Sequence, residues 1–363
     1  MNAKLFSPAL LAAGALFAAV SQANAQPYIF TDLGSQSYGR AINNAGQVAG
    51  YSYLPGTNAN HATLWNGTTA TDLGTLGGSY SSALSINNDG QVAGYAELPD
   101  FMQHATVWNG ATATDLETPT GSHSEAQAIN DTGQVVGAIF SPSTERRATV
   151  WNGTTPTELE TLGGQSSQAR AINNAGQVAG YSYLSDEVTN HATLWNGTTA
   201  TDLGTLGGRS SLANDINNES QVVGYSYLSG DNAYHATIWN DTAATDLGTL
   251  GGERSEAYAI NDAGLAVGWA NTPDGVTHAT VWNGTVATDL NSFLDASMAN
   301  AGWVLERAYD INDNGWIVGD ARIGQSGENH AFLLAPIPEP ETYAMFLAGL
   351  GLMGVMSRRR KTS

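Results

Sequence analysis

Short apolar and β-branched runs, separated by turns rich in Gly and Asn, repeat along the chain from about residue 28 to residue 334. Each repeat contains an Ile-Asn pair, a Gly-x-Val-x-Gly-like run such as 46–50, and a His-Ala-Thr-Leu-Trp-like run such as 61–65. A Thr-Asp-Leu element such as 71–73 closes the repeat. The Ile-Asn pairs begin at Ile42, Ile86, Ile129, Ile172, Ile216, Ile260 and Ile311. They are 43 or 44 residues apart, with 51 residues before the last one.

Each repeat predicts four short strands. The Asn-Asn-Ala-Gly stretch at 43–46 and the Asn66-Gly67 pair are typical of hairpin turns, because Asn and Gly tolerate positive φ. The Gly-Gly-x-x-Ser stretch at 77–81 supplies a third connection, and Val, Ile, Thr, Tyr and Trp fill the runs between turns. Four strands in a repeat of this length are typical of one β-propeller blade.

The two ends of the repeat region are out of phase in a way that predicts a closed ring. The region begins with a last element, Thr-Asp-Leu at 31–33, and ends with a third element, His-Ala-Phe-Leu-Leu at 330–334. The first residues would therefore complete the last sheet and remove an exposed edge. We expect an all-β fold, a seven-bladed β-propeller of ~43-residue repeats closed by the N-terminal strand. The alternative, an open β-solenoid, would need polar capping repeats, and the sequence shows none.

These repeats resemble the HAF-repeat family of extracellular proteins, named for a His-Ala-Phe triplet that is literal here only at 330–332. The resemblance covers roughly residues 28–334. It implies export and repeated β structure, but no particular ligand or reaction.

The N-terminus has the pattern of a signal peptide. Lys4 precedes an apolar run at 9–20, and Ala23 and Ala25 then form a small-x-small cleavage signal. We expect residues 1–25 to be removed by cleavage before Gln26.

The C-terminus has three parts: a Pro-Glu-Pro triplet, an apolar run at 342–356, and a basic cluster. Its marker residues are Pro338, Glu339, Pro340, Arg358, Arg359 and Arg360. This order resembles the PEP-CTERM sorting signal of Gram-negative bacteria, which implies processing by an exosortase, a membrane-embedded cysteine protease. The alternative is an ordinary membrane anchor, with its basic cluster on the cytoplasmic side. We therefore divide the chain into a signal peptide (1–25), a propeller (26–336), and a sorting signal with a transmembrane helix and an Arg-rich tail (337–363).

The composition narrows the classes of function. A formal net charge of −20 argues against nucleic-acid binding, which needs clustered Lys and Arg. The absence of Cys excludes disulfides and thiolate metal sites. Removal of both end segments would also remove both lysines, Lys4 and Lys361, and leave an acidic, soluble body.

Most residues that could carry chemistry recur once per repeat, which indicates scaffold roles. Six His occupy one slot, six Trp another, and seven acidic residues the Asp slot of Thr-Asp-Leu. Equivalent positions in separate blades cannot converge on one metal ion unless they line the axis. We expect the His side chains to hydrogen-bond within a blade and the Trp side chains to pack between blades, with a sugar-stacking platform as the alternative for Trp. We expect no metal and no cofactor.

No catalytic residues can be assigned from the sequence. A repeated acid does not single out the carboxylate pair that glycoside hydrolysis needs, and the chain has no Gly-x-Ser-x-Gly elbow or Walker loop. A non-enzymatic role is therefore our first expectation. The second is a carbohydrate-active hydrolase or lyase with Asp215, Asp310 and Glu306 at the channel mouth.

Variation between the repeats of this one chain indicates where a ligand would bind. The connections before the His-slot strands differ most, at 54–60, 98–103, 141–146, 185–190, 229–234 and 271–277, and all would emerge on one rim. The residue two places before each repeated Ile also varies, as Arg40, Leu84, Gln127, Arg170, Asn214, Tyr258 and Tyr309. If that strand is innermost, these residues approach the channel mouth. Our candidate ligand rim is Arg40, Arg170, Tyr258, Tyr309 and the off-pattern Trp269.

The last repeat contains an insertion between residues 290 and 309. We expect a short surface helix near 292–300 that decorates the closure region. A functional loop is the alternative.

Together these features predict an exported surface or extracellular-matrix protein with a structural or binding role. Its expected partners are an exosortase, the membrane before processing, and exopolysaccharide or cell-surface components, with no nucleic acid. A protein-binding scaffold is a further alternative.

Overall fold

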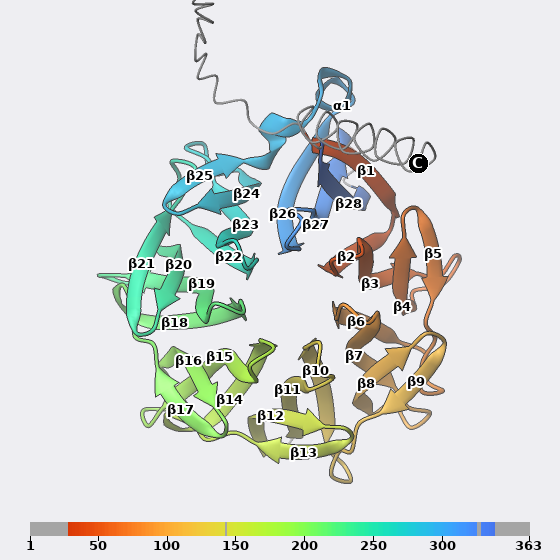
Figure 1. Ribbon diagram of the computed structural model, residues 1–363, viewed down its shortest axis with the longest axis vertical. Helices are drawn as coiled ribbons and strands as arrows, with labels where there is room; N and C mark the ends of the chain where they lie inside the picture. Colours follow the sequence, from red (N-terminus) through yellow and green to blue (C-terminus); the bar gives the residue numbers. More distant parts are fainter. Residues whose placement is uncertain (1–27, 142–143, 325–327, 338–363) are drawn as a thin grey trace, which may run out of the picture.

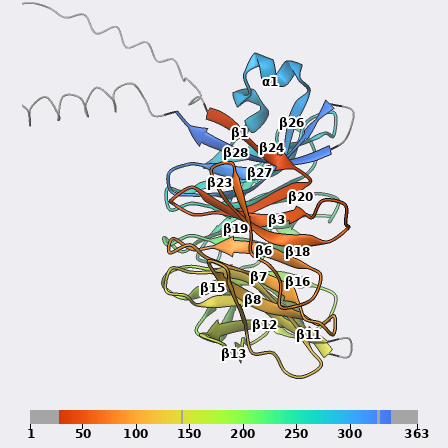
Figure 2. The same cartoon turned by 90° about the vertical axis from the view of Figure 1, so that its right-hand side faces the viewer.

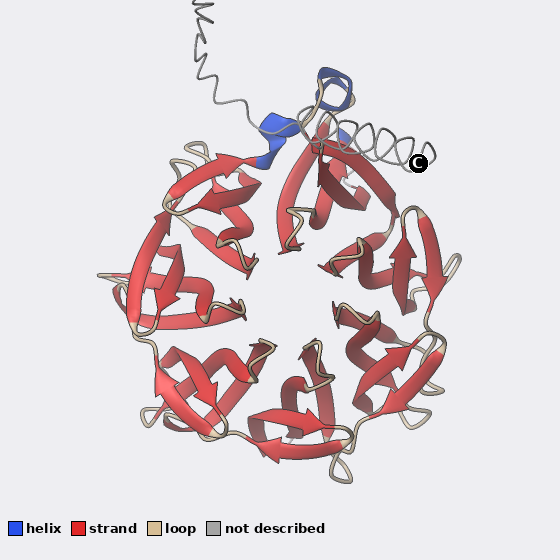
Figure 3. Ribbon diagram, in the orientation of Figure 1, coloured by secondary structure: helices blue, strands red, loops and turns tan. Residues whose placement is uncertain are grey.

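The computed structural model describes residues 28–141, 144–324 and 328–337. They form seven four-stranded antiparallel sheets arranged as blades around a central axis (Figure 1), and the molecule is a flat disc when seen from the side (Figure 2). Within the part of the chain that the structure describes, the helices η1 (Leu290–Phe293) and α1 (Ala296–Asn300) lie together in one short segment beside the last blade (Figure 3). The predicted seven-bladed β-propeller is confirmed.

In each blade the strands follow one another outward from the axis, and blades 1 to 6 are continuous in sequence. Blade 1 contains β2 (Ser37–Ile42), β3 (Gln47–Tyr53), β4 (Asn60–Asn66) and β5 (Thr69–Asp72). Blade 2 contains β6 (Ser81–Ile86), β7 (Gln91–Glu97), β8 (Gln103–Asn109) and β9 (Thr112–Asp115). Blade 3 contains β10 (His123–Ile129), β11 (Val135–Ser141), β12 (Thr144–Asn152) and β13 (Thr155–Glu158).

The next three blades repeat this order. Blade 4 contains β14 (Gly163–Ile172), β15 (Gln177–Leu184), β16 (Asn190–Asn196) and β17 (Thr199–Asp202). Blade 5 contains β18 (Gly207–Ile216), β19 (Gln221–Leu228), β20 (Tyr234–Asn240) and β21 (Ala243–Gly248). Blade 6 contains β22 (Ser255–Ile260), β23 (Leu265–Asn271), β24 (Thr277–Asn283) and β25 (Val286–Asp289).

Blade 7 joins the two ends of the chain. Its inner strands are β26 (Trp303–Ile311), β27 (Ile317–Ile323) and β28 (Glu328–Pro336), and its outermost strand is β1 (Tyr28–Ser35). β1 pairs antiparallel with β28, with Thr31 opposite Leu333 and Ile29 opposite Ala335. The predicted closure by the N-terminal strand is therefore present, and it pairs an edge that would otherwise be open.

The hydrophobic core is divided into seven clusters, one between each pair of neighbouring blades. Trp108 of blade 2, for example, packs against Ala49 and Leu73 of blade 1 as well as Val92 of its own blade. The six repeated Trp side chains are almost fully buried in this way. The six repeated tryptophans therefore pack between blades, as the sequence predicts.

The seventh interface is built differently, because Leu334 occupies the Trp slot of the last repeat. Trp303, Leu305 and Phe332 fill the space. The insertion forms a 3₁₀ helix, η1 (Leu290–Phe293), and a short helix, α1 (Ala296–Asn300), which cover this cluster. The Phe293 ring lies 4.9 Å from the ring of Tyr28 in β1, so the insertion also buttresses the closing strand.

The Asn of each Ile-Asn pair connects neighbouring blades. Asn43 donates its side-chain Nδ2 to the carbonyl of Asn87 at 3.1 Å, and the Asn residues of the following blades repeat this contact. Asn312 donates to the carbonyl of Asn43 at 2.9 Å and completes the ring. The Oδ1 of the same Asn accepts backbone N–H groups of its own turn, as in Asn43 with Gln47 at 3.0 Å. These seven turns therefore line the narrow end of the channel as one hydrogen-bonded ring.

The repeated His and Asp pair within each blade. His61 Nδ1 on β4 lies 2.9 Å from a carboxylate oxygen of Asp72 on β5, and five other blades have the same contact. In blade 7 the pair joins His330 to Asp32, from opposite ends of the chain, at 3.0 Å. Each pair lies on the two outer strands, away from the axis.

Candidate functional site: the wide end of the central channel

The innermost strand of every blade contains a β-bulge at one equivalent position. The pairing register shifts between Gly39 and Ala41 in blade 1, and it shifts at the corresponding place in every other blade. The bulged residues are Arg40, Leu84, Gln127, Arg170, Asn214, Tyr258 and Tyr309. A bulge re-aims a side chain relative to the regular alternation of a strand. Seven side chains, one from each blade, are thereby brought to the channel.

A repeated glycine on the second strand makes room for each bulge. In blade 1 this is Gly50, where a Cβ atom would overlap the carbonyl oxygen of Tyr38. Gly94, Gly137, Gly180, Gly224, Gly268 and Gly319 face the corresponding carbonyl in the other blades. The last Gly of the Gly-x-Val-x-Gly run is therefore a requirement of the inner-strand bulge.

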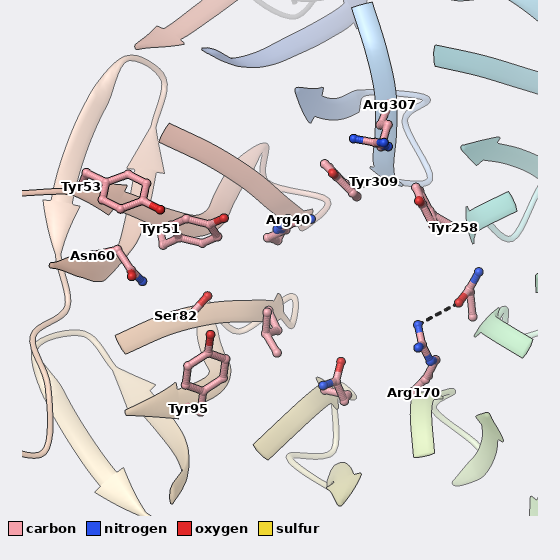
Figure 4. A pocket seen from close by; sticks show the side chains of 13 residues that line it. Arg40, Tyr51, Tyr53, Asn60, Ser82, Tyr95, Arg170, Tyr258, Arg307 and Tyr309 are labelled. Carbon is pink, nitrogen blue, oxygen red and sulfur yellow. Dashed lines mark hydrogen bonds between the residues drawn. The ribbon is translucent and has the colours of Figure 1, made fainter. Parts of the chain in front are cut away.

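The bulged residues line a cavity of about 580 Å³ at the wide end of the channel (Figure 4). We call it the funnel. All seven bulged residues belong to its lining, together with Tyr51, Tyr53, Asn60, Ser82, Tyr95 and Arg307. The cavity size is typical of a site for a small ligand or a short stretch of polymer. The funnel opens on the face that carries the variable connections between second and third strands, because Tyr53 and Asn60 flank one of them.

One wall of the funnel is a stack of three side chains from three blades. The guanidinium carbon of Arg40 lies 4.2 Å from the ring centre of Tyr309, and the Tyr309 ring stacks on Tyr258 with centroids 5.4 Å apart. Burial raises the pKa of Tyr309 to about 12, and the nearby Asp320 adds to this. The stack therefore presents neutral phenol groups and one permanent positive charge.

A second wall is a hydrogen-bonded chain across blades 4, 5 and 6. Arg170 donates to Asn214 Oδ1 at 3.1 Å, and Asn214 donates to Glu256 at 3.0 Å. Trp269 donates its indole N–H to the Tyr258 hydroxyl at 3.0 Å and approaches Glu256 at 3.3 Å. Burial raises the pKa of Glu256, while the hydrogen bond from Asn214 opposes that rise. Arg170, Asn214 and Tyr258 are thus held in place by groups behind the lining.

The structure gives the five predicted rim residues different positions. Arg40, Arg170, Tyr258 and Tyr309 lie together in the funnel lining. Trp269 lies behind it, largely buried, and holds Tyr258. Whether these residues bind a ligand stays a prediction.

Asn60 belongs to the variable connection at 54–60, whereas five lining residues were not singled out from the sequence, namely Tyr51, Tyr53, Ser82, Tyr95 and Arg307. Ser82 and Arg307 lie two positions before a bulge and so point the same way, a signal that strand alternation could have supplied. Tyr51 and Tyr95 follow the repeated glycine of the second strand. Their place in the lining depends on the tilt of each blade, which the sequence does not encode locally.

The three acids proposed for a hydrolase are not gathered in the funnel. Asp215 and Asp310 precede the repeated Ile, and each accepts two backbone N–H groups, its own Ile and the Ile of the next blade. Glu306 pairs with Arg322. Among the described residues, the funnel lining contains no carboxylate.

Asp215 and Asp310 are nevertheless unusual. Burial raises the pKa of Asp215 to about 6. Burial, together with the charge of Asp215, raises the pKa of Asp310 to about 7. Four of the other five repeats have Ala at this slot, namely Ala41, Ala128, Ala171 and Ala259.

Within residues 28–141, 144–324 and 328–337, no group of three or more His or acidic residues is arranged to hold a metal ion. In the same ranges no helix has the length and apolarity to cross a bilayer. The predicted signal peptide, the predicted transmembrane helix and the Arg cluster lie outside the described residues.

The molecule is thus a closed seven-bladed propeller with one polar funnel on its axis. A PEP-CTERM protein-sorting motif matches residues 336–361, which confirms the predicted sorting signal. Such a motif implies export and recognition by an exosortase. That match concerns the tail alone, so the HAF-repeat resemblance of the body stays a prediction.

Two solved structures are partly similar to this chain. TolB from Acinetobacter baumannii is similar over 80% of this chain and 63% of its own, with 10% identity and a TM-score of 0.45. The chain therefore spans less than two thirds of TolB. An arginine-to-alanine triple mutant of AofleA from Arthrobotrys oligospora is similar over 73% of this chain and 90% of its own, with 10% identity and a TM-score of 0.38. No curated protein matches the sequence.

Proposed function

We propose that this chain is an exported, exosortase-processed binding protein of the cell surface or extracellular matrix, and that the funnel is its ligand site. The carrying observation is the position of the bulges. The His, Trp, Asn and Gly slots of the strands and turns each keep one dominant residue type, whereas the seven bulged residues vary among Arg, Leu, Gln, Asn and Tyr and all line one cavity. A rigid scaffold that presents varied side chains in one cavity is the usual arrangement of a binding site.

The position of the tail supports this role. β28 runs from the funnel face to the opposite face and ends at Pro336, beside the turn that contains Gly315. The sorting motif begins at that residue. The tail therefore leaves the body on the face opposite the funnel, so membrane attachment through the tail would leave the funnel accessible.

The chemistry of the lining supports binding without turnover. Phenols, amides and guanidinium groups donate hydrogen bonds to sugar hydroxyls, and burial, which raises the pKa of Tyr258 and Tyr309, keeps these two phenols protonated at neutral pH. A saccharide of the host's own extracellular matrix is the ligand class that fits the exported location. We propose a binding role in preference to hydrolysis on these grounds.

A variant in which a large side chain fills the funnel tests the proposal. The exported body, residues 26–337, is suitable because its seven sheets are complete in themselves. We expect wild type to bind at least one member of a panel of neutral and acidic oligosaccharides in calorimetry, with no new reducing ends. Gln127→Trp, which fills the funnel, should weaken that binding at least about tenfold, because the ligand and the indole compete for one space.

Val286→Trp is the matched control, since Val286 is exposed on the outer strand β25 and contributes nothing to the funnel. Equal binding by both variants would place the ligand elsewhere. Release of reducing ends that a single acidic substitution abolishes would replace the binding role with an enzymatic one.

A further inference from the structure

The funnel has a charge that is opposite to that of the protein as a whole. The chain has a formal net charge of −20, with 33 acidic and 13 basic residues. Yet three arginines, Arg40, Arg170 and Arg307, line the funnel, and no carboxylate does so among the described residues. Such a concentration of one sign in a cavity attracts ligands of the opposite sign.

The charges behind the lining do not fully neutralise these arginines. Asp320 lies 4.0 Å from the guanidinium of Arg307, and Glu256 reaches Arg170 only through Asn214. Burial raises the pKa of both acids, while the nearby arginines oppose that rise. Glu125, a further acid near this wall, is engaged by Arg146 and Gln168.

Two of the arginines have donors without partners. The Nε–H groups of Arg40 and Arg170 are buried and donate to no acceptor among the described residues. One face of the Arg40 guanidinium is covered by Tyr309. A buried N–H without an acceptor is costly, so a shift of either arginine that brings its guanidinium against a carboxylate in the funnel would be favourable.

The remainder of the lining fits a sugar ring. Tyr51, Tyr95 and Tyr258 bring aromatic rings and hydroxyls to the lining, and Gln127 brings an amide that can pair with sugar hydroxyls. Arg40 and Arg170 come from blades 1 and 4, three blades apart around the ring, and Figure 4 shows them on different sides of the cavity. This separation suits two acidic groups on neighbouring sugar units. One compact phosphate is usually bound at a helix N-terminus or a glycine-rich loop instead.

We infer that the funnel binds an acidic oligosaccharide, in which Arg40 and Arg170 each receive a carboxylate and the tyrosines receive the sugar rings. The inference rests on the proposed function, since it names the ligand class of the same funnel. Planar guanidinium groups bind carboxylates through paired hydrogen bonds, which lysine cannot reproduce. Binding should therefore depend on the guanidinium group itself as well as on its charge.

The experiment compares galacturonate oligomers of two to four units with neutral galactose oligomers of equal length, using calorimetry on residues 26–337. We expect the acidic oligomers to bind at least about tenfold more tightly, with an affinity that falls as NaCl is raised. Arg40→Gln and Arg170→Gln should each lower that affinity about tenfold or more. Gln is the residue that the third repeat carries at this slot, so the fold should tolerate it. Arg40→Lys should restore only part of the loss.

Arg209→Gln is the matched control, because it removes the same charge from a side chain that is 64% exposed outside the funnel. Thermal unfolding checks that each variant folds. If a variant does not fold, the salt dependence of binding to wild type is the second measurement. Equal affinity for neutral and acidic oligomers, or no salt dependence, would overturn the inference and leave the binding function intact. Binding of inorganic phosphate or sulfate without binding of the uronate oligomers would also overturn it. If no saccharide binds in the funnel, both proposals fail.

Discussion

Two buried aspartates show how one residue changes the role of a repeated slot. In most repeats the residue before the repeated Ile is Ala, but Asp215 and Asp310 place carboxylates there. Each forms backbone hydrogen bonds to its own blade and to the next one, so it ties two blades together. The stabilising hydrogen bonds are opposed by the cost of burying a charge.

This balance predicts a pH dependence of stability. The pKa of Asp310 is raised to about 7 in the folded protein, above its value in an unfolded chain, so folding favours the protonated form. The stability that the protonated Asp310 contributes is fully present below the pKa of this group in the unfolded chain. It is lost as the pH rises toward and through 7. Asp310→Ala should therefore cost more stability at pH 5 than at pH 8, with a difference in slope of up to about 1.4 kcal/mol per pH unit.

Urea unfolding of wild type and variant at several pH values measures this difference. Asp89→Ala is the control. Asp89 is exposed in the turn that follows the first strand of blade 2, so its removal should leave the pH dependence of stability as in wild type. Parallel stability curves for wild type and Asp310→Ala would contradict the prediction.

At the scale of a single element, the bulged inner strand is the feature on which the funnel depends. It needs an extra residue in the first strand and, in the second strand, a glycine opposite the residue just before the extra one. The extra residue points its side chain toward the axis, where it can vary without disturbing the packing between blades. Repetition of the scaffold and variation of the site are thus separated within one strand of six to ten residues.

The glycine requirement can be tested in blade 3. A Cβ at Gly137 would overlap the carbonyl oxygen of Glu125, so Gly137→Ala should lower the free energy of unfolding by about 1–3 kcal/mol. It should also displace Gln127 from the funnel, because the bulge must move.

Gly153→Ala in the same blade is the comparison. Gly153 has a φ of +63° but open space around it, so only backbone strain opposes the change, and we expect a cost of about 1 kcal/mol. Denaturant unfolding gives both values. A smaller loss for Gly137→Ala than for Gly153→Ala would contradict the steric account.

For the whole molecule, the decisive contact is the pairing of β1 with β28. It holds the two ends of the chain in one sheet, adds the sixth His–Asp pair, and completes a disc in which every blade has two neighbours. The Asn ring at the narrow end closes through the same junction, from Asn312 to Asn43.

A cysteine pair can trap this closure, because the chain has no Cys of its own. Ile29 and Ala335 are opposite each other in the pairing of β1 and β28, at a separation that antiparallel pairs and disulfides share. Ile29→Cys with Ala335→Cys should form a disulfide in air and migrate faster in non-reducing electrophoresis. It should also raise stability by about 2–4 kcal/mol, since it closes nearly the whole body into a loop.

The single variant Ile29→Cys is the control and should form only intermolecular dimers. Failure of the double variant to form an intramolecular bond, or equal stability before and after reduction, would mean that the ends of the chain are not held together in solution.

Periodicity was enough to establish the architecture. The recurring Ile-Asn, His-Ala and Thr-Asp-Leu elements determined the number of blades, the four strands in each, and the closure by residues 28–35, because each strand and turn depends on local residue types and short spacings. The same periodicity assigned the Trp residues to packing. The residues two places before each Ile were predicted to approach the channel mouth only on the condition that their strand is the innermost one.

Only the folded ring shows that these bulged residues line one cavity. Bulges, the tilt of the blades and the approach of residues from separate repeats are consequences of packing between distant segments, which no local pattern encodes. Only this packing brings Arg40 of blade 1 against Tyr309 of blade 7, sets Arg170 beside Asn214, and places Pro336 on the face opposite the funnel. It also separates Asp215, Asp310 and Glu306 from the funnel lining, because backbone N–H groups and Arg322 are their nearest partners once the blades are assembled.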